Sequence, residues 1–383
     1  MNGTIYMPVG EVCSSISDTY REKKNMVTLI NTSDVLEGRV LNHERVPNSN
    51  LKGQFKKTFQ RDDILYSEIR PQNRRFAYVD FSPIDYIAST KLMVIRAKKD
   101  VVSPKYLYYF LKNSFTVAEL QLLAETRSGT FPQITFSEVA NLTIPVPSLA
   151  VQEVIVQTMQ CLEDKITCNE QINDNLQQQA MALYAEMFLN SSDNNVTSGT
   201  LSDIAAITMG QSPSGSSYNE DGVGEVFYQG RAEFGFRFPK RRLFTTEPKR
   251  MAETGDVLLS VRAPVGDLNV AYERCCIGRG LGAIHSKTGH SSFVLYTMFA
   301  LRSQLDVFNG EGTVFGSINR DALNAIPIDI PPVTEIDQFE AVAHPIDELI
   351  RANYEENCRL EAIRDSLLPK LMSGEIDVSA VNL

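Results

Sequence analysis

Basic and amide side chains cluster around the turns of this 383-residue sequence, where their types suit the phosphates and base edges of a nucleic acid. Arg and Lys neutralise phosphates, Arg can bond two acceptors of a guanine edge at once, and Gln and Asn can do the same with adenine. The alternative is solvated surface charge, which we expect for about half of these residues individually. The candidates are Lys56, Lys57, Arg70, Asn73, Arg74, Arg75, Arg127, Ser128, Thr130, Gln211, Ser212, Ser214, Gln229, Arg231, Arg237, Lys240, Arg241, Arg242, Arg262 and Arg279.

Two of these arginines are the preferred candidates. Arg70 and Arg262 match across an internal repeat, and each ends a predicted strand beside a proline turn. One sequence does not decide which candidate contacts a base and which a phosphate.

Motifs for catalysis and metal binding are missing from the sequence. It has neither the Asn/Asp-Pro-Pro-aromatic loop with which an adenine methyltransferase holds a flipped base nor the GxxxxGK[ST] loop of a nucleotide-driven motor. The glycine-rich run at 278–282 is better explained as a turn between strands than as a nucleotide loop, because no helix is expected directly after it. The four histidines show no metal-ligand spacing, and the six cysteines include no CxxC pair. We therefore expect no catalyst, no metal site and reduced thiols in a cytosol.

The negative charge of the chain is concentrated in two short segments. The formal net charge is −10, yet residues 1–147 hold 19 basic against 15 acidic side chains. Residues 148–198 hold 1 against 7, residues 199–331 hold 13 against 14, and residues 332–383 hold 4 against 11. The acidity lies in equivalent places of the two halves, so the globular parts remain compatible with a nucleic-acid partner.

The sequence is a tandem repeat, which decides the fold prediction. ITFSEVANLTIPVP at 134–147 aligns with INRDALNAIPIDIP at 318–331, and the offset of 184 continues without a gap through the segments that follow. A Gly-Thr pair lies just upstream of each copy, at 129–130 and 312–313. DILYSEIR at 63–70 echoes DVLLSVR at 256–262 more faintly. We predict two units, each with a variable globular part and a more similar tail.

The globular parts, at residues 1–147 and 191–331, are predicted to be mixed α/β domains. Short β-branched and aromatic runs, such as 64–69, 92–95, 142–146 and 257–261, alternate with Gly, Pro, Asn and Asp and predict strands. One helix is expected in each part, near 104–113 and 292–304.

The tails, at residues 148–190 and 332–383, have the a/d heptad pattern of a coiled coil. Both seams carry two asparagines at the same heptad positions, and a buried polar layer is tolerated chiefly where it fixes register. We therefore predict that the two helices form an antiparallel pair in which the asparagine layers meet. The alternative, that each helix packs separately on its own domain, is less favoured. Pro345 predicts a short helix followed by a longer one in the second tail. The seam residues are Ile155, Leu162, Ile166, Asn169, Asn173, Leu176, Leu183, Ile346, Ile350, Asn353, Asn357, Leu360 and Leu367.

The order of these segments resembles the specificity subunit of type I restriction-modification enzymes. A variable domain is followed by GTFPQI at 129–134, IPVP at 144–147 and a long Gln-containing helix, and then the order repeats. LLPKLMSGEI at 367–376 is similar to the usual ending of that family. The resemblance covers essentially the whole chain and lies in the repeat architecture more than in any short motif. PPVTEIDQ at 331–338 departs from it, because its Gln comes later than in PSLAVQ at 147–152.

The resemblance implies an α+β fold in which two tandem mixed α/β target recognition domains are separated by two long helices that form an antiparallel coiled coil. Each domain would read one half of a split double-stranded DNA sequence. The helices would act as a spacer and bind two adenine-methylating modification subunits, and nuclease-translocase (restriction) subunits would complete the assembly. The chain itself would hold no cofactor, because S-adenosylmethionine is expected on the methyltransferase partners.

Other classes of function fit the residues less well. A coiled-coil scaffold whose domains bind protein or glycan ligands is the alternative, and the local basic clusters and acidic helices favour DNA over it. An enzyme using the loop at 278–282 is a third, weaker interpretation. No apolar run approaches the roughly 20 residues that cross a bilayer, so a cytoplasmic protein without membrane contact is expected. The resemblance implies that its host is a prokaryote.

Overall fold

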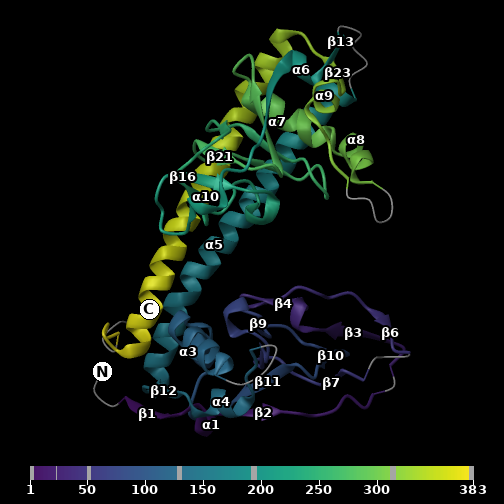
Figure 1. The fold of residues 1–383 in the computed structure, drawn as a ribbon. Coiled ribbons are helices and arrows are strands. Elements are labelled where there is room, and N and C mark those ends of the chain that lie inside the picture. Colours follow the sequence, from purple (N-terminus) through teal and green to yellow (C-terminus); the bar gives the residue numbers. More distant parts are fainter. Residues whose placement is uncertain are drawn as a thin grey trace. The chain divides into compact units, whose positions relative to one another are not determined.

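The structure, a computed structural model, describes residues 4–22, 24–49, 53–126, 132–190, 196–310 and 316–378 and divides into two compact units (Figure 1). Unit 1 comprises Met1–Thr167 and Asn357–Leu383, and unit 2 comprises Cys168–Glu356. Unit 2 is thus one stretch of chain, whereas unit 1 is assembled from two stretches. Among the described helices, none is long and apolar enough to cross a membrane.

Unit 1 holds twelve strands in its described residues, four short helices and parts of two long ones. The strands are β1 (Ile5–Pro8), β2 (Cys13–Ile16), β3 (Met26–Ile30), β4 (Val35–Leu36), β5 (Arg39–Val40), β6 (Val46–Pro47), β7 (Phe55–Lys57), β8 (Ile64–Ser67), β9 (Phe76–Tyr78), β10 (Tyr86–Ser89), β11 (Leu92–Ala97) and β12 (Thr143–Val146). The helices are α1 (Val9–Val12), α2 (Pro104–Lys112), α3 (Ser114–Glu125), α4 (Phe136–Asn141), the first part of α5 (Leu149–Tyr184) and the last part of α10 (Val333–Ser373).

Unit 2 holds the remaining elements of the described chain. Its strands are β13 (Thr197–Thr200), β14 (Ala205–Met209), β15 (Tyr218–Asn219), β16 (Glu225–Tyr228), β17 (Phe244–Thr245), β18 (Met251–Ala252), β19 (Val257–Ser260), β20 (Leu268–Val270), β21 (Cys275–Ile277), β22 (Leu281–Ser286) and β23 (Pro327–Ile330). Its helices are α6 (Leu201–Ile204), α7 (Ser291–Ala300), α8 (Arg302–Asp306) and α9 (Arg320–Asn324), with the last part of α5 and the first part of α10.

Both units contain the same four-stranded antiparallel sheet. Its order is β2-β11-β8-β9 in unit 1 and β14-β22-β19-β20 in unit 2. A parallel pair accompanies it in each unit, β3 with β10 and β16 with β21. The repeat is therefore a repeat of topology, also where the similarity of sequence is faint.

The long helices supply part of the core of each unit. In unit 1, Ile155 of α5 and Leu371 of α10 belong to one apolar cluster with the strands and with α2. In unit 2, Phe339 of α10 and Tyr184 of α5 occupy the corresponding cluster. The start of one helix and the end of the other thus close each core, and burial of this apolar surface stabilises their pairing.

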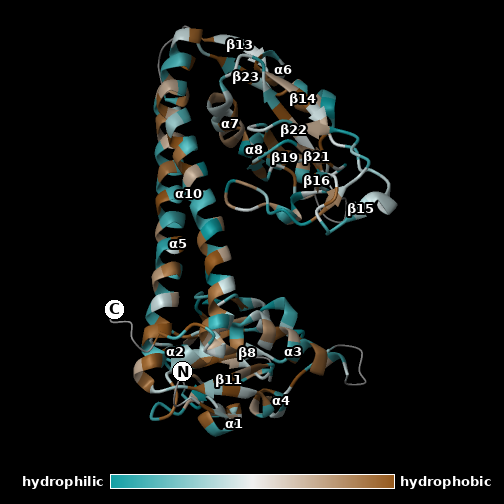
Figure 2. Cartoon of the chain, turned by 90° about the vertical axis from the view of Figure 1, so that its left-hand side faces the viewer, coloured by the Kyte–Doolittle hydropathy of each residue, from teal (hydrophilic) through white to brown (hydrophobic). Residues whose placement is uncertain are grey.

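The two helices run antiparallel, as predicted. In unit 2, Asn353 Nδ2 donates to Asn173 Oδ1 over 2.8 Å, and Asn169 Nδ2 donates to Glu356 Oε2 over 2.7 Å. The residue numbers rise along one helix while they fall along the other, which fixes the direction. Every predicted seam residue is buried or half-buried, and Figure 2 shows apolar residues alternating with polar ones along both helices.

Helix α10 is continuous, so the predicted interruption at Pro345 is wrong. Pro345 is exposed, and apolar contacts hold the helix on both sides of it, with Ala343 and Ile350 fully buried. A proline removes one N–H and crowds the preceding turn. Here the packing on both sides outweighs that cost.

The glutamine of the PSLAVQ segment has a structural task. Gln152 is fully buried, and its Oε1 accepts from the backbone N–H of Ser103, which precedes the first turn of α2, over 2.8 Å. In unit 2 the later glutamine, Gln338, is exposed. Glu340 takes the task there, accepting from two backbone N–H groups in the first turn of α7 over 3.1 and 2.9 Å. The departure in sequence leaves the anchoring of the globular part to the long helix intact.

Candidate nucleic-acid interface

A turn directly after a central strand of unit 1 places Arg70 on the surface. The Ser67 hydroxyl donates to the Ile69 carbonyl over 3.3 Å, and the Arg70 N–H donates to the Pro132 carbonyl over 3.1 Å. Arg70 has a φ of 45°, in the left-handed region that non-glycine residues rarely adopt. The backbone is thus held on two sides while the side chain is exposed.

The same turn recurs in unit 2 after β19. The Ser260 hydroxyl donates to the Arg262 carbonyl over 3.0 Å, and the Ala263 N–H donates to the Gly316 carbonyl over 3.0 Å. Arg262 is exposed and forms an isolated antiparallel bridge with Ser317.

These hydrogen bonds correct the predicted equivalence of the two arginines. Ser67 matches Ser260, so Arg262 occupies the position of Ile69, whereas Arg70 matches Ala263. Two residues separate Ser67 from Arg70, but only one separates Ser260 from Arg262. Matching the two arginines therefore requires a one-residue gap, and the backbone hydrogen bonds show no such gap. Each unit therefore carries its arginine at a different position of a common turn.

Arg262 and Arg279 line one hollow of about 540 Å³ in unit 2. Both side chains are exposed, and within the described part of the chain neither forms an ion pair. The Arg279 N–H donates to Ser212 Oγ over 3.2 Å, which fixes the backbone at this point. Two cations without carboxylate partners make the hollow attractive to an anionic or electron-rich group. The other lining residues are Met209, Val261, Ala263, Gly316, Ser317, Ile318 and Asn319.

Two predicted glutamines, Gln211 and Gln229, lie beside this hollow, and their backbone groups form hydrogen bonds with the turn that carries Arg279. The Gln211 N–H donates to the Ile277 carbonyl over 3.0 Å, and the Gly280 N–H donates to the Gln229 carbonyl over 3.2 Å. Both glutamine side chains are exposed. The structure thus gathers five predicted residues at the turn between β21 and β22, namely Gln211, Ser212, Gln229, Arg262 and Arg279. Ser214 lies nearby in sequence, but its hydroxyl bonds to Ser216 over 2.8 Å.

Arg237 does not belong to an exposed surface. Its side chain is only 4% exposed, and Nη1 pairs with Asp347 of α10 over 2.8 Å. Nη2 donates to Gln177 of α5 over 3.0 Å and to the Tyr296 hydroxyl over 3.4 Å. This arginine holds the globular part of unit 2 to both long helices, so we leave it out of the proposed DNA surface.

Three further arginines of unit 2 are exposed but paired with acids. Arg231 pairs with Asp267, Arg241 with Glu273, and Arg242 with Glu233 and Glu220. Exposed ion pairs of this kind contribute little to stability and can exchange partners readily. Lys240 is also exposed.

Two candidates of unit 1 bond to the protein's own backbone. Lys57 is half-buried, and its Nζ donates to the Thr90 and Leu92 carbonyls over 3.0 and 2.7 Å. Burial lowers the pKa of this lysine. Arg75 donates through Nη1 to the Ser33 carbonyl over 3.0 Å. Both therefore support the fold of unit 1.

The remaining candidates of unit 1 surround the Arg70 turn or lie apart from it. Asn73 is exposed, and Arg74 is half-buried with a φ of 51°. Lys56 is exposed on β7. Arg127, Ser128 and Thr130 lie outside the described residues, as do both Gly-Thr pairs.

Sequence reasoning missed Ser317 and Asn319, which line the hollow of unit 2. Both directly follow the Gly-Thr segment that recurs upstream of each repeated tail. That recurrence was the available signal, because a segment repeated beside a variable domain marks a fixed position on it.

The glycine-rich run at 278–282 is a turn between strands, as predicted, since β21 ends at Ile277 and β22 begins at Leu281. A Cβ on Gly278 would lie 2.8 Å from Gln229 Cα, so the glycine allows two backbones to approach closely. In the preceding strand, β21, burial raises the pKa of the Cys275 thiol to about 12, which keeps it protonated at neutral pH.

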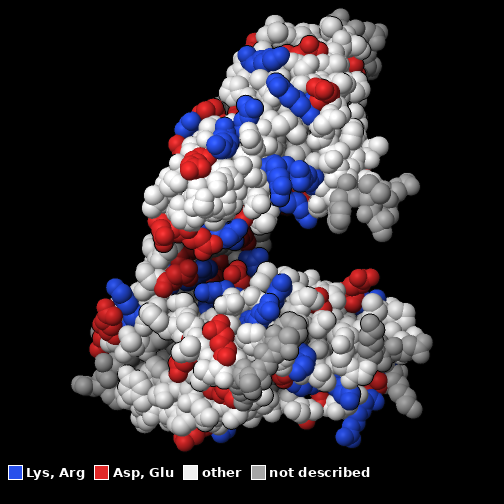
Figure 3. Space-filling view, in the orientation of Figure 1, with Lys and Arg blue, Asp and Glu red and all other residues white. Residues whose placement is uncertain are grey.

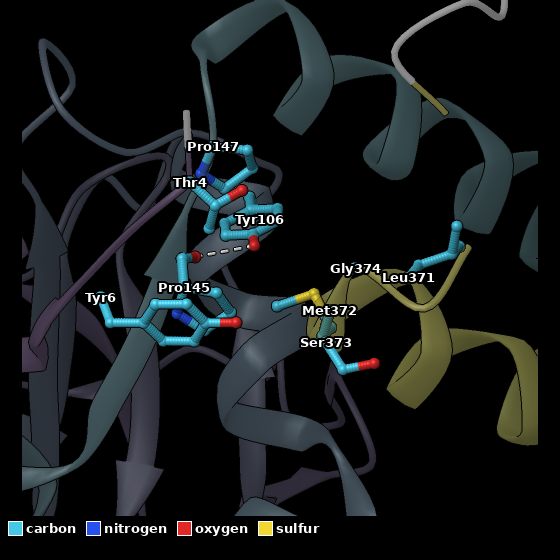
Figure 4. Close-up of a pocket in the computed structure, with 9 residues that line it drawn as sticks. All are labelled: Thr4, Tyr6, Tyr106, Pro145, Pro147, Leu371, Met372, Ser373 and Gly374. Atoms are coloured by element: carbon cyan, nitrogen blue, oxygen red, sulfur yellow. Dashed lines mark hydrogen bonds between the residues drawn. The ribbon is translucent and has the colours of Figure 1, made fainter. Parts of the chain in front are cut away.

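A second, smaller cavity of about 100 Å³ lies in unit 1, where the end of α10 meets β1 and β12 (Figure 4). Met372 and Thr4 line it, and the Tyr106 hydroxyl donates to the Pro145 carbonyl at its wall over 2.8 Å. Its size suits a few water molecules rather than a ligand, for which 300 Å³ or more is usual. The described residues hold no group of His, Cys, Asp or Glu side chains suited to a metal ion.

Charge is unevenly distributed over the surface of the molecule. Figure 3 shows Lys and Arg side chains gathered in patches on the globular parts, and Asp and Glu side chains gathered where the long helices run. A duplex would be attracted to the first kind of surface and repelled by the second.

Comparison with known proteins identifies the family. Residues 6–178 and 194–355 each match the model of the type I restriction modification DNA specificity domain. The chain is 30% identical over 337 residues to a candidate specificity subunit of the type I restriction enzyme MjaX of Methanocaldococcus jannaschii, covering 82% of this chain and 79% of that protein.

Two further comparisons agree. The chain is 41% identical over 177 residues to the type I restriction enzyme HindI specificity subunit of Haemophilus influenzae, covering 46% of this chain and 39% of that one. Its fold is similar to a type I restriction-modification S subunit from M. genitalium, with a TM-score of 0.54, 15% identity and coverage of 98% and 97% of the two chains. The chain therefore belongs to the type I restriction-modification specificity subunits and carries two copies of their DNA specificity domain.

Proposed function

We propose that this chain reads a bipartite DNA target and positions two adenine-N6 methyltransferase subunits on it, without catalysing a reaction itself. The first recognition domain comprises residues 1–147 and the second residues 191–331. The segments at 148–190 and 332–383 form the spacer and bind the partners. Restriction subunits join this core in the full complex, which works in the prokaryotic cytoplasm.

The observation that carries the proposal is the repeated turn with different side chains. The same hydrogen bonds hold the backbone after β8 and after β19, but the exposed residues differ. Two domains that recognise different DNA sequences can share one backbone turn if they differ in the side chains it presents, because base edges are distinguished by the side chains that reach them.

The long helices support the spacer role. Each core contains the start of one helix and the end of the other, and α5 alone, with 36 residues, is about 54 Å long. Several exposed apolar residues along both helices, among them Ile172, Met181, Val342, Leu349 and Ile363, offer contact area to protein partners.

Methylome sequencing tests the proposal directly. Cells that carry the gene with its methyltransferase partner should show adenine methylation in one motif of two short sequences separated by a fixed, unread gap. Deleting this gene alone should erase the motif. A motif that persists after deletion would exclude the DNA-reading role and favour a scaffold that binds protein or glycan ligands.

A further inference from the structure

The backbone hydrogen bonds match residues around the hollow of unit 2 with residues of unit 1. The Val261 N–H donates to the Gly280 carbonyl over 3.0 Å, and the Glu68 N–H donates to the Lys91 carbonyl over 3.0 Å. Gly280 therefore matches Lys91, and Arg279, one residue before Gly280, matches Thr90.

In unit 1 the positive charge of Lys91, which matches Gly280, is already paired within the protein. Lys91 Nζ lies 3.4 Å from Glu68 Oε2 and 3.4 Å from Gln133 Oε1. A lysine that already has a carboxylate and an amide oxygen as partners offers less to a ligand than an unpaired one.

In unit 2 both of these partners are missing. Valine stands in place of Glu68, and Ser317 in place of Gln133. Arg262 and Arg279 are instead exposed at the rim of an open hollow, and the backbone beneath them is held by Ser260, Ser212 and the bridge to Ser317.

We propose that this hollow is the specificity-determining site of unit 2 and that it reads guanine in the major groove through Arg262 and Arg279. This rests on the proposed function. A guanidinium group presents two parallel N–H donors, and guanine presents two adjacent acceptors, O6 and N7, on its major-groove edge. Holding the backbone on both sides reduces the entropy lost when the side chain meets the base.

The test uses the full chain with its methyltransferase partner in cells, compared by methylome sequencing. Wild-type protein should give one half-site that contains guanine. Arg262→Gln and Arg279→Gln should each relax or shift the preference at one guanine of that half-site, by about tenfold or more, because glutamine matches adenine rather than guanine. The other half-site and the gap should stay unchanged. Lys249→Gln, an exposed lysine of the same unit that lies outside the hollow, is the matched loss of charge and should leave both half-sites intact.

A second measurement identifies the atom that is read. Duplexes with 7-deazaguanine at the affected position lack the N7 acceptor, so wild-type complex should bind them about tenfold more weakly. The Arg262→Gln or Arg279→Gln complex whose preference changed at that position should lose nothing further.

The outcomes separate this inference from the function on which it rests. If a bipartite motif is found but both variants leave its half-sites unchanged, or weaken binding equally to all sequences, the arginines do not read guanine and the inference is wrong. If wild-type cells contain no bipartite motif dependent on this gene, the proposed function itself fails.

Discussion

The contacts that an arginine side chain already makes decide whether it can stabilise the fold or bind a ligand. Arg237 and Arg262 are both arginines near turns of the same globular part, yet Arg237 is enclosed by Asp347, Gln177 and Tyr296, whereas Arg262 is exposed at a hollow. The first can stabilise the fold, and the second remains available to a ligand.

Replacing Arg237 by alanine should lower the free energy of unfolding by about 3–5 kcal/mol, because it leaves the carboxylate of Asp347 without its buried partner. Chemical denaturation of the full chain measures this. Lys240→Ala, at an exposed position nearby in sequence, should change stability by no more than about 0.5 kcal/mol. Equal stability of the two variants would contradict the buried pair.

The six thiols should differ sharply in their reaction with an alkylating reagent. Burial raises the pKa of Cys13 and Cys275 to about 12, and the reactive form is the thiolate. These thiols therefore stay protonated below that pH. At pH 8, mass spectrometry of the native chain treated with iodoacetamide should show labelling of Cys161, Cys168 and Cys358, which are exposed, before any labelling of the buried thiols. Rapid labelling of Cys275 would mean that its strand opens readily.

At the scale of elements, the polar layer of the helix pair is the most informative feature. Asn173 and Asn353 bond to each other, and Asn173 also lies 3.5 Å from the Ile350 carbonyl. A buried amide that loses its partner costs more than a pair replaced together by apolar groups. The layer therefore favours this register without requiring the highest stability.

A double-mutant cycle tests this. Asn173→Leu and Asn353→Leu should each destabilise the full chain, whereas the double variant should be more stable than either, with a coupling of about 1 kcal/mol or more in chemical denaturation. Strictly additive effects would show that the two amides act independently of each other.

Sequence reasoning predicted elements well where periodicity or repetition carried the information. The heptad seam, its asparagine layer and the strand-connecting turn at 278–282 are all local patterns, and the structure contains them. Pro345 misled the prediction because an intrinsic preference was weighed without the packing of Ala343 and Ile350 on either side.

The candidate site was harder to predict, because contacts distant in sequence decide it. The ion pair of Arg237 with Asp347 joins residues 110 positions apart. The match of Arg262 to Ile69 depends on hydrogen bonds to Ser317 and Pro132 segments that no short comparison of strands includes. Composition and turn propensity therefore predicted the turns that carry the candidate site, but not which of their basic residues are free to bind a ligand.

At the scale of the whole molecule, the helices should set the gap between the half-sites. Four residues added to α5 after Asn173 and to α10 before Asn353, two positions that face each other, should lengthen each helix by about 6 Å and keep the asparagine pair. Since base pairs rise about 3.4 Å, the unread gap should grow by one or two pairs. Methylome sequencing reads the result. Half-sites that change while the gap stays fixed would show that the helices are not the ruler.

Unit 1 is completed by residues of α10 that are translated after the whole of unit 2. Leu371 and Met372 complete a core whose other members, such as Val9 and Ile155, were synthesised far earlier, while unit 2 is translated in between. A nascent chain therefore carries its first globular part with an open apolar face until translation has passed unit 2 and reached Met372. A product cut short after unit 2 would keep that face exposed to chaperones and proteases. Discarding such products would leave few chains with only one completed unit, so the interleaved order of assembly acts as a check that both units are synthesised.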